Sequence, residues 1–325
     1  MNQARTLASV SSSPAAEGLR VIQAGPLALL QDAGRFGVRH LGVTQGGPVD
    51  LHAWAWANAL VGNGWGSAAL EVTLGGLTLE ATKRLNIAVC GADLGVMLEG
   101  RPAPLWRTAT LMPGQRLCFG APVSGVRAYL AVTGGFQADP VLDSVSAVVR
   151  EGLGGHDGQG VALKAGDKLR VAEIDPVTRH RQVPHQEIPD YDQTCELPLI
   201  PGAQVGRFSG ASLFAAFNQP WKVDDRADRM GVRLRGPRLE SDITSMISEG
   251  IGLGAVQVPP DGQPIVLLND RQTIGGYPRL GALTPLGASR LAQCLPGREV
   301  RIRPVSHEWA LTQARAFRAR IDDAR

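Results

Sequence analysis

Residues 69–81, ALEVTLGGLTLEA, alternate apolar and polar side chains on both sides of a Gly-Gly pair. Such alternation over about four to eight residues is typical of a β-strand that has one face against a core. A glycine inside the pattern marks a turn or a bulge. The stretch therefore predicts two short strands that meet at Gly75 and Gly76.

Strand-like segments continue on both sides of this stretch. The first half of the chain also contains LRVIQAG, LNIAVCG, LCFGA and RAYLAVTGG, and the second half contains LPLIPGAQVGRF, MGVRLRGP and PIVLLND. The 40 glycines and 22 prolines are spread evenly, which indicates many turns between short strands. We therefore expect a mainly β protein.

One pattern recurs three times along the chain. Each copy begins with an apolar or Cys residue and one further residue. Pro or Ala comes next, then Gly, and then two polar residues that lead into a strand. The copies are LMPGQRLCF (111–119), LKAGDKLRV (163–171) and CLPGREVRI (294–302). A turn glycine that leads into a strand is typical of a hairpin that closes a barrel. Two related β lobes would explain the copies, and so would chance recurrence of a common turn.

The order of the segments predicts five regions. Residues 1–18 are rich in Ser and Ala and are expected to be a disordered tail, and residues 176–196 are polar and contain prolines, as in a linker. Between and after them we expect one β lobe at 19–175, a second at 197–305, and a helix at 306–325. A helix with Asp50 as its N-cap is expected at LHAWAWANALV, ending before Gly62.

Charge and cysteine content exclude several classes of function. The net charge is only +3 and no run of five or more cations occurs, whereas nucleic-acid binding needs a concentrated basic face. The four cysteines are far apart and form no C-x-x-C pair, so we expect free thiols and no zinc site. They are Cys90, Cys118, Cys195 and Cys294.

The chain also lacks targeting and cofactor motifs. Its N-terminus has no apolar signal segment, and no run approaches the roughly 18 apolar residues that span a membrane. We expect a cytoplasmic protein without a membrane partner. No phosphate loop, G-x-S-x-G elbow, H-E-x-x-H motif or biotin-attachment segment is present. A reaction that uses ATP or biotin would need another chain or a non-standard site.

Polar side chains gather in four glycine-rich loops, at 31–35, 228–231, 248–264 and 269–278. Asp32 and Arg35 can pair with each other or hold a polar ligand. Pro-Pro-Asp-Gly at 259–262 is typical of a tight turn. Five polar residues precede Gly275 and Gly276, where the exposed backbone allows a ligand to approach closely.

These loops carry a resemblance to a known family. The matching segments are QDAGRFGVRHLGV, GGPVD, ANALVGN, ALEVTLGG, GADL, PGQRLCFG, RAYLAVTGGF, GLGG, DRMGVRL and SEGIGLGAVQVPPDGQPIVLLNDRQTIGGYPRL. From about Leu19 to Arg303 the chain resembles the biotin-dependent carboxyltransferase A/B family, also called allophanate hydrolase subunit 2 or urea amidolyase-related. The resemblance implies two joined cyclophilin-like β-barrel subdomains with a few short helices.

The resemblance implies three alternative functions. One branch of the family belongs to urea carboxylase and helps to move carboxylate from carboxybiotin to urea or a related amide. A stand-alone branch resembles the C-type component of bacterial 5-oxoprolinase. This hydrolase also contains A- and B-type subunits, with which the C-type component works. A third description is a regulatory protein that antagonises a kinase inhibitor resembling the B-type component; there an apolar surface for the partner, rather than polar site residues, would be essential.

A separate chain without a biotin carboxylase or biotin carrier resembles the stand-alone branch most. The resemblance therefore implies ATP-dependent opening of the 5-oxoproline lactam to glutamate, together with A- and B-type subunits. ATP, with Mg²⁺, is expected to be bound by the complex. No biotin is expected on this chain, and the chain is expected to be inactive alone.

The resemblance and the residue types together suggest roles. Activating a lactam needs cations and amide donors near developing negative charge, and groups that transfer protons. The expected catalytic residues are Asp32, Arg35, Arg229, Glu249 and Asp270. The expected substrate-binding residues are Gln31, Gln257, Gln272, Thr273, Gly275, Gly276 and Tyr277, and no residue is assigned to a metal.

The chain departs from the usual family pattern in a few positions. Val145 stands where relatives have Arg, and Ala147 and Ile274 stand where hydroxyl side chains are usual. Thr44-Gln45-Gly46-Gly47 replaces a segment with Pro and Ser-Gly. These changes are expected to bear on the choice of substrate.

Overall fold

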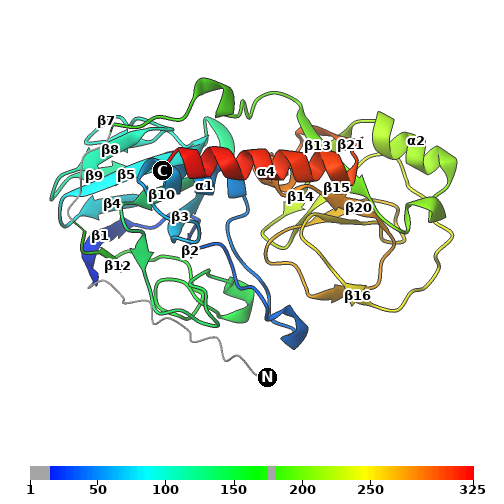
Figure 1. The fold of residues 1–325 in the computed structure, drawn as a ribbon, viewed down its shortest axis with the longest axis horizontal. Helices are drawn as coiled ribbons and strands as arrows, with labels where there is room; N and C mark the ends of the chain where they lie inside the picture. The colour runs from blue at the N-terminus through cyan, green and yellow to red at the C-terminus, as the bar shows by residue number, and fades with distance from the viewer. Residues whose placement is uncertain (1–14, 175–179) are drawn as a thin grey trace, which may run out of the picture.

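The computed structural model describes residues 15–174 and 180–325 and consists of two β lobes with one long helix laid across them (Figure 1). The first lobe holds strands β1 to β12 and helix α1, and the second holds β13 to β21 with helices α2 and α3. The expected mainly β fold with two lobes and a few helices is confirmed.

The first lobe is built from two sheets that pack around one core. The seven-stranded sheet has the order β11-β12-β1-β4-β9-β6-β7, and the five-stranded sheet has the order β2-β3-β10-β5-β8. Leu70 and Val72 of one sheet share this core with Leu79 and Leu117 of the other, as alternation along each strand requires. The strands are β1 Ala15–Gln23, β2 Leu27–Gln31, β3 Ala69–Thr73, β4 Thr78–Ala81, β5 Leu85–Asp93, β6 Met97–Leu98, β7 Arg101–Pro102, β8 Thr108–Leu111, β9 Arg116–Cys118, β10 Ser124–Val132, β11 Phe136–Gln137 and β12 Lys168–Ala172.

Helix α1 (Leu51–Leu60) covers the outer face of the five-stranded sheet. The Asp50 carboxylate caps it by accepting a hydrogen bond from the Ala53 N–H at 3.0 Å, and Gly62 follows its end with a φ of 75°. The helix is buried almost all round, Trp54 included, because α3 and α4 pack on its other side. The predicted helix and its N-cap are confirmed.

Residues 69–81 form a turn, but not a hairpin between neighbouring strands. β3 belongs to the five-stranded sheet and β4 to the seven-stranded one. Leu74, Gly75 and Gly76 have positive φ values of 60°, 75° and 73°. A Cβ on Gly75 would lie 1.6 Å from the carbonyl oxygen of Gly120, so only glycine fits there. The Gly-Gly pair therefore carries the chain from one layer of the lobe to the other.

The second lobe is a closed barrel of the order β13-β20-β17-β18-β15-β14-β21. The parallel pairing of β13 with β21 closes it, and Trp221 lies fully buried in its core. Its strands are β13 Cys195–Pro201, β14 Trp221–Ala227, β15 Gly231–Arg235, β17 Ala255–Gln257, β18 Ile265–Leu267, β20 Arg279–Leu283 and β21 Glu299–Pro304, and its helices are α2 Gly210–Asn218 and α3 Pro285–Leu291. Strands β16 (Glu249–Gly250) and β19 (Ile274–Gly275) form a separate two-stranded ribbon beside the barrel.

The three recurring segments adopt one hydrogen-bonded turn. In each copy the glycine has a positive φ, and the N–H of the next residue donates to the carbonyl three residues before it. The glycine N–H also donates to the carbonyl of a partner residue in, or at the end of, a neighbouring strand. The N–H of this partner residue donates in turn to the carbonyl of the residue that follows the glycine. The pairs are Gly114 with Ala81, Gly166 with Val21, and Gly297 with Val223. The recurrence is structural, but the predicted hairpins are wrong: β8 and β9 lie in different sheets, and β21 follows helix α3.

Helix α4 (His307–Asp323) lies across both lobes, from the barrel to the helix α1 of the first lobe (Figure 1). Its Phe317 and Ile321 are buried in the apolar cluster around α1. Arg320 pairs with Glu187 at 3.0 Å, in the segment between the lobes. The predicted C-terminal helix is confirmed, and it also joins the lobes.

Two predicted boundaries shift. Strand β1 begins at Ala15 rather than at Leu19, because its first residues pair with β12; residues 1–14 of the predicted tail lie outside the described residues. Residues 175–179, at the start of the predicted linker, also lie outside them. The rest of the linker contains the 3-10 helix η3 (His185–Glu187), and β13 begins at Cys195, inside the predicted linker range.

The four cysteines are free, as predicted. Cys90 and Cys195 are buried, whereas Cys118 and Cys294 are only partly buried. Within the two described ranges, no helix combines the length and the apolar character needed to cross a bilayer.

Candidate functional site

The last residue of β2 and the segment after it tie together the loops in which most of the predicted site residues lie. Gln31 is fully buried, and its side-chain amide donates to the Ala147 carbonyl at 2.9 Å and accepts from the Gly47 N–H at 3.2 Å. Both ends of this amide are therefore engaged inside the protein. Gln31 positions the 44–47 segment rather than facing open solvent.

Asp32 organises the neighbouring loop 141–147. Its carboxylate accepts from the hydroxyls of Ser144 and Ser146, both at 2.6 Å. It also accepts from the N–H groups of Gly34 and Val145, both at 2.8 Å. With four donors around it, this carboxylate fastens loop 141–147 to the segment that follows β2.

The Arg35 guanidinium is buried beneath the same loop. Its Nε donates to the Val141 carbonyl at 3.0 Å and its Nη2 to the Ser144 carbonyl at 3.3 Å, while Nη1 has no partner. Burial lowers the pKa of Arg35. Asp32 and Arg35 thus each bind loop 141–147, and no ion pair between them is among the described interactions.

Arg229 forms the polar centre of the contact between the lobes. Its guanidinium makes a two-pronged pair with Asp270, at 2.9 and 3.0 Å, and a further ion pair with Glu71 of strand β3 at 2.6 Å. Its Nη2 also donates to the Gly47 carbonyl at 2.8 Å. Arg229 and Asp270, predicted from separate loops, are thus brought together.

Glu71 extends this network into the first lobe. Its side chain lies beside that of Tyr129 in the next strand, and the Tyr129 hydroxyl donates to it at 2.6 Å. The Val49 N–H donates to the same oxygen at 3.1 Å. Burial alone would raise the pKa of Glu71, but the guanidinium groups of Arg229 and Arg127 lower it.

The pKa values of the carboxylates on the two sides of Arg229 are shifted in opposite directions. Burial raises the pKa of Asp270, with a further contribution from the negative charges of Glu71 and Asp228, in spite of the pairing with Arg229. The pKa of Arg229 itself is raised, because Asp270 and Glu71 outweigh its burial. Of the two buried carboxylates, Asp270 is therefore the better placed to exchange a proton.

Further contacts between the lobes come from residues next to Asp270. The Asn269 side-chain amide donates to the carbonyls of Gly46 and Pro48, at 3.2 and 3.0 Å. The Arg271 Nη2 donates to the side chain of Gln45 at 3.2 Å. Segment 45–48 of the first lobe thus lies directly against segment 269–271 of the barrel.

Arg39 and Arg271 converge on one carbonyl group. Arg39 donates to the Ile251 carbonyl at 2.6 Å and to the Thr273 carbonyl at 3.2 Å, and Arg271 donates to the Ile251 carbonyl at 3.2 Å. Burial, and then the charge of Arg39, lower the pKa of Arg271 to about 10. Neither guanidinium forms an ion pair with a described carboxylate.

Gln257 lies beneath the β16–β19 ribbon. Its side chain is 2% exposed, and its Nε2 donors have no partner. A Cβ on Gly275 would lie 2.7 Å from this nitrogen, so a larger residue at position 275 would displace it. Gln272 and Thr273, which contact Arg39 through their carbonyls, lead directly into this ribbon.

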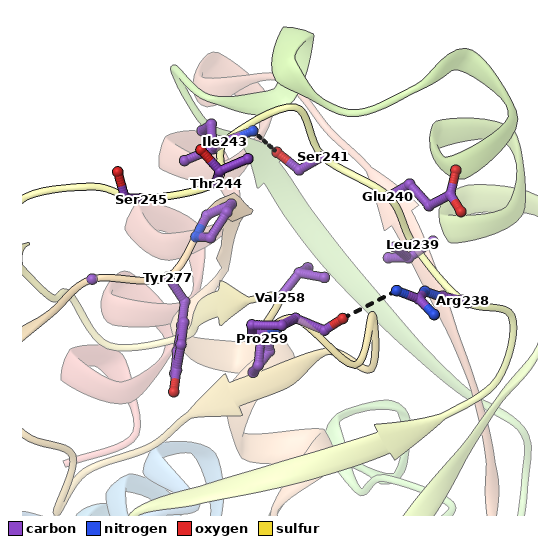
Figure 2. A pocket seen from close by; sticks show the side chains of 13 residues that line it. Arg238, Leu239, Glu240, Ser241, Ile243, Thr244, Ser245, Val258, Pro259 and Tyr277 are labelled. Atoms are coloured by element: carbon purple, nitrogen blue, oxygen red, sulfur yellow. Dashed lines mark hydrogen bonds between the residues drawn. The ribbon is translucent and has the colours of Figure 1, made fainter.

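A pocket of about 570 Å³ opens on the other side of the ribbon (Figure 2). Gly276 and Tyr277 line it together with the Pro-Pro turn at 259–260 and the loop 238–245. Figure 2 shows Arg238 and Tyr277 on either side of Pro259, with the hydroxyls of Ser241, Thr244 and Ser245 coming from the loop. The loop 238–245 carries no regular spacing, and we did not expect a role for it.

The structure does not bring every predicted residue into one site. Glu249 is exposed on β16, where it pairs with Arg279 and accepts from Gln204 at 3.4 Å. Tyr277 faces the pocket, apart from the contact between the lobes. The remaining predicted residues fall into two groups: Gln31, Asp32 and Arg35 support the loops of the first lobe, and Arg229, Gln257, Asp270, Gln272, Thr273, Gly275 and Gly276 lie on the barrel side.

The departures from the family pattern have different surroundings. Val145 contributes its backbone N–H to Asp32, and Ala147 is fully buried with its carbonyl bonded to Gln31. Ile274 instead is 60% exposed on β19. Val145 is only partly buried, and Ile274 is the most exposed of the three side chains.

Glu71, Tyr129 and Arg39 belong to the network but lie outside the loops in which site residues were predicted. Glu71 and Tyr129 sit in strands that read as ordinary sheet, and Arg39 sits among dispersed arginines. A charged residue in the strand ALEVT is the one signal that could have drawn notice, because both faces of this strand are buried. Among the described residues, no group of three or more His, Cys, Asp or Glu is placed to hold a metal ion.

Comparisons with known proteins agree in one family. The family model described as carboxyltransferase domain, subdomain A and B, matches residues 41–304. The C-type component of 5-oxoprolinase from Escherichia coli (strain K12) is 36% identical over 294 residues, which cover 90% of this chain and 93% of that protein. The protein of the same name from Haemophilus influenzae is 34% identical over 299 residues, covering 92% and 94%.

Solved structures share the fold. The K. lactis urea amidolyase superposes with a TM-score of 0.89 at 25% identity over 98% of this chain, which spans 20% of that protein. TTHA0988 superposes with a TM-score of 0.78 at 36% identity over 88% of this chain, which spans 56% of that protein. In both, a unit like this chain is part of a longer polypeptide.

Proposed function

This chain belongs to the carboxyltransferase subdomain A and B family, and on that premise we propose that it is a subunit of an ATP-dependent 5-oxoprolinase. The complex would open the lactam ring of 5-oxoproline to give glutamate, with A- and B-type subunits as partners. The chain supplies binding and proton-transfer groups and is inactive alone.

One observation carries the proposal. Two proteins that bear the name of the C-type component of 5-oxoprolinase match this chain at 34–36% identity along more than nine-tenths of their own length. The urea amidolyase of Saccharomyces cerevisiae is 28% identical, and this chain covers only 16% of it. The higher identity, over almost the whole length of those two relatives, favours the 5-oxoprolinase component over a urea amidolyase.

Gln257 is the amide donor best suited to the lactam oxygen. A lactam is a poor electrophile, and phosphorylation of its oxygen by ATP makes the ring carbon open to attack by water. Donors aimed at the developing negative charge are the largest single contribution to such catalysis. The Gln257 Nε2 group is buried and has no partner within the described chain. Gln272, Thr273 and the backbone at Gly275 and Gly276 belong to the ribbon above it.

Asp270 is the group that we assign to proton transfer. When the C–N bond of the ring breaks, the nitrogen must gain a proton, and attack by water releases one. The raised pKa of Asp270 suits a group that holds and returns that proton. Arg229 fixes the orientation of Asp270 through its two-pronged pair, and Arg35 and Arg271 add positive charge nearby.

The pocket beside Tyr277 is the proposed entry for the substrate. Its hydroxyls and the exposed Arg238 suit a small polar molecule that carries a carboxylate, as 5-oxoproline does. Tyr277 and Gly276 connect the pocket to the ribbon above Gln257. We assign ATP, with its Mg²⁺, to the assembled complex and no biotin to this chain.

The decisive test is ATP hydrolysis that depends on 5-oxoproline. This chain would be mixed with A- and B-type subunits, each component would be left out in turn, and glutamate would be measured as product. We expect activity to vanish without this chain. No activity in any mixture, although the subunits bind each other, would refute the proposal.

Variants would then test the assigned roles in the complete complex. Gln257→Leu and Asp270→Asn keep similar volumes and are expected to lower kcat by about 100-fold or more, since each removes a group that acts in the transition state. Arg233→Ala, a variant of the partly exposed arginine on β15 of the same barrel, serves as the control. Full activity of Glu249→Ala would show that Glu249 is not a catalytic residue.

Carboxyl transfer to urea or a related amide is the second candidate function. The TM-score of 0.89 with the K. lactis urea amidolyase favours it. Under this alternative, a biotin carrier protein carrying carboxybiotin would replace ATP as the second substrate. Carboxylation of urea by this chain with such a carrier, and no glutamate formation, would select it.

A further inference from the structure

Arg39 of the first lobe reaches the β16–β19 ribbon of the barrel. It lies in the 3-10 helix η1 (Arg39–Leu41), in the long loop that begins after β2. Its Nη2 donates to the Ile251 carbonyl at 2.6 Å, to the Thr273 carbonyl at 3.2 Å and to the Gln272 carbonyl at 3.5 Å. In Figure 1 the blue segment of η1 lies below the barrel, toward strand β16. Arg39 thus binds the residue that follows β16 and the residue that precedes β19.

The loop that carries Arg39 is closed at its base within the first lobe. The Arg35 N–H donates to the Gln45 carbonyl at 2.7 Å, and Gly42 ends η1 in the left-handed conformation with a φ of 80°. The Arg35 side chain is fully buried and donates to two carbonyls of loop 141–147. The first lobe therefore fixes the backbone from which the Arg39 side chain extends toward the ribbon.

The ribbon has few other attachments in the part of the chain that the structure describes. Strands β16 and β19 pair through two residues each and form a sheet of their own, outside the barrel. On the barrel side, Arg279 pairs with Glu249 and donates to the Gly250 carbonyl at 3.0 Å. Arg271 donates to the Ile251 carbonyl at 3.2 Å. The hydrogen bonds that described residues of the first lobe donate to the ribbon and its ends all come from Arg39.

The inner side of the ribbon lies on the Gln257 side chain. A Cβ on Gly275 would stand 2.7 Å from the Gln257 Nε2 and 2.4 Å from the Ile251 Cδ1, so the Gly275 backbone lies close to both. Ile251 is 2% exposed and packs in one cluster with Ala255 and Leu267 of the barrel. The Gln257 Nε2 has no hydrogen-bond partner among the described residues that would fix it from another side. The position of the ribbon therefore limits where this amide can point.

Arginine suits this contact because its planar guanidinium presents several donors in fixed directions. Arg39 donates to carbonyls on both sides of the ribbon, Ile251 after β16 and Thr273 before β19. One side chain thus fixes the ends of both strands relative to the first lobe. A lysine keeps the charge, but its ammonium lies on a flexible stem and lacks the planar array of donors.

We propose that Arg39 is a positioning residue for Gln257, because it keeps the ribbon in place against the Gln257 amide. The proposal rests on the proposed function, in which this amide stabilises negative charge on the lactam oxygen. Such a donor is effective only when it is already in place as the charge develops, and a displacement of about 1 Å can cost about 100-fold in rate. The contact between the lobes thus controls the donor, although Gln257 and the ribbon both belong to the barrel side.

The first experiment follows the Gln257 side chain by NMR in this chain alone. The glutamine side-chain amides are isotope-labelled, and the signal of Gln257 is identified as the one that Gln257→Leu removes. Arg39→Met, which keeps an unbranched side chain but has no donors, should shift or broaden that signal. Gly275→Ala, which crowds the amide from the ribbon and leaves the contact between the lobes intact, should do the same. Arg39→Lys should move the signal less than Arg39→Met does.

Each variant has a matched control. Arg20→Gln removes an arginine of the first lobe that forms an exposed ion pair with Glu17 in β1. Gly250→Ala adds a Cβ to the other strand of the ribbon, where it would meet nothing within 4 Å. Both controls should leave the Gln257 signal where it is in the unchanged chain.

The second experiment measures turnover of 5-oxoproline in the complete complex. Arg39→Met should lower kcat about tenfold or more and change KM by about threefold or less, because the proposed entry pocket opens on the other side of the ribbon. In a chain that already carries Gln257→Leu, Arg39→Met should lower kcat no further, since the effect of Arg39 passes through Gln257. The two control variants should keep the kcat of the unchanged chain.

The outcomes separate this inference from the proposed function. A Gln257 signal that stays in place in Arg39→Met would overturn the positioning role, and so would an unchanged kcat. Equal loss of kcat with and without Gln257→Leu would also overturn it, because Arg39 would then act independently of the amide. If the complex that contains the unchanged chain forms no glutamate, the proposed function fails. The NMR signal then decides by itself whether Arg39 positions the Gln257 amide.

Discussion

Arg229 shows how much a single side chain contributes at the contact between the lobes. It binds Glu71 of the first lobe and Asp270 of the second, and all three side chains are buried. A buried ion network adds little compared with apolar packing when it is complete, but losing one member leaves an unpaired charge in a medium of low polarity. The arrangement therefore fixes the geometry of the site more than it stabilises the fold.

Replacement of Arg229 is expected to destabilise the protein strongly. Arg229→Met leaves the Glu71 and Asp270 carboxylates buried without their cation, which should lower the free energy of unfolding by about 3–5 kcal/mol. Urea denaturation followed by fluorescence would measure it. Arg233→Ala removes the partly exposed pair with Asp261 and should cost about 1 kcal/mol or less. Equal losses in the two variants would contradict this role of Arg229.

His52 predicts a specific dependence of stability on pH. Its ring is surrounded by Trp56, Trp106 and Phe317, and burial lowers its pKa to about 3. The unfolded chain takes up a proton at this histidine near pH 6.5, whereas the folded chain does so only near pH 3. The contribution to stability is therefore complete above pH 6.5 and decreases as the pH falls toward 3.

His52→Phe should reduce the loss of stability that occurs as the pH falls. We expect the slope of the free energy of unfolding between pH 6 and 4 to fall by up to about 1.4 kcal/mol per pH unit, the value for one proton. Denaturant titrations of both proteins at several pH values would measure the difference. The same slope in both proteins would show that His52 takes up a proton while the protein is folded.

At the scale of elements, the shared turn depends on the backbone conformation of its glycine. Gly166 has a φ of 93°, and a Cβ at this position would meet nothing within 4 Å. Any cost of a side chain there comes from backbone strain rather than from crowding. The turn feeds β12, which pairs with β1 in the seven-stranded sheet.

Gly166→Ala is accordingly expected to lower the free energy of unfolding by about 1–2 kcal/mol, and Gly166→Asn by less, because asparagine tolerates the left-handed region. Thermal unfolding would compare the two. Gly206→Ala, at a glycine with equal space but no positive φ, should be neutral or slightly stabilising. A larger loss for Asn than for Ala would show that the side chain, not the backbone, decides.

At the scale of the whole molecule, helix α4 joins the lobes. It follows the last strand of the barrel and packs its far end on α1 of the first lobe. Phe317 lies stacked on His52 with 5.4 Å between ring centres and is almost fully buried. The two lobes therefore share this apolar contact in addition to the network around Arg229.

Phe317→Ala should destabilise both lobes together. We expect a loss of about 3–5 kcal/mol, the range found for truncating buried aromatic residues. Phe214→Ala on the exposed side of α2 should change the free energy of unfolding by about 0.5 kcal/mol or less. Calorimetry would also show whether one unfolding transition splits into two. A single transition that barely shifts would mean that α4 does not couple the lobes.

Much of the fold follows from local pattern. Alternation in 69–81 predicted strands, Asp50 and Gly62 marked the ends of α1, and the recurring glycine turns were visible before their hydrogen bonds were known. Each of these features depends on residues within a few positions of one another, so the sequence expresses them directly. Which strands became neighbours was not local, and the predicted hairpins failed for that reason.

The sequence by itself thus determined a mainly β chain with two lobes, its helix ends and turns, and the polar loops that resemble one family. The tertiary structure alone decided which polar side chains meet. Glu71 and Arg229 are 158 positions apart, and Arg39 and Thr273 are 234 apart. Such pairs form only when the packing of the lobes brings distant loops together, and no short-range spacing encodes that. For the same reason, the four donors around Asp32 and the place of Glu249, away from the contact between the lobes, became visible only once the lobes were in place.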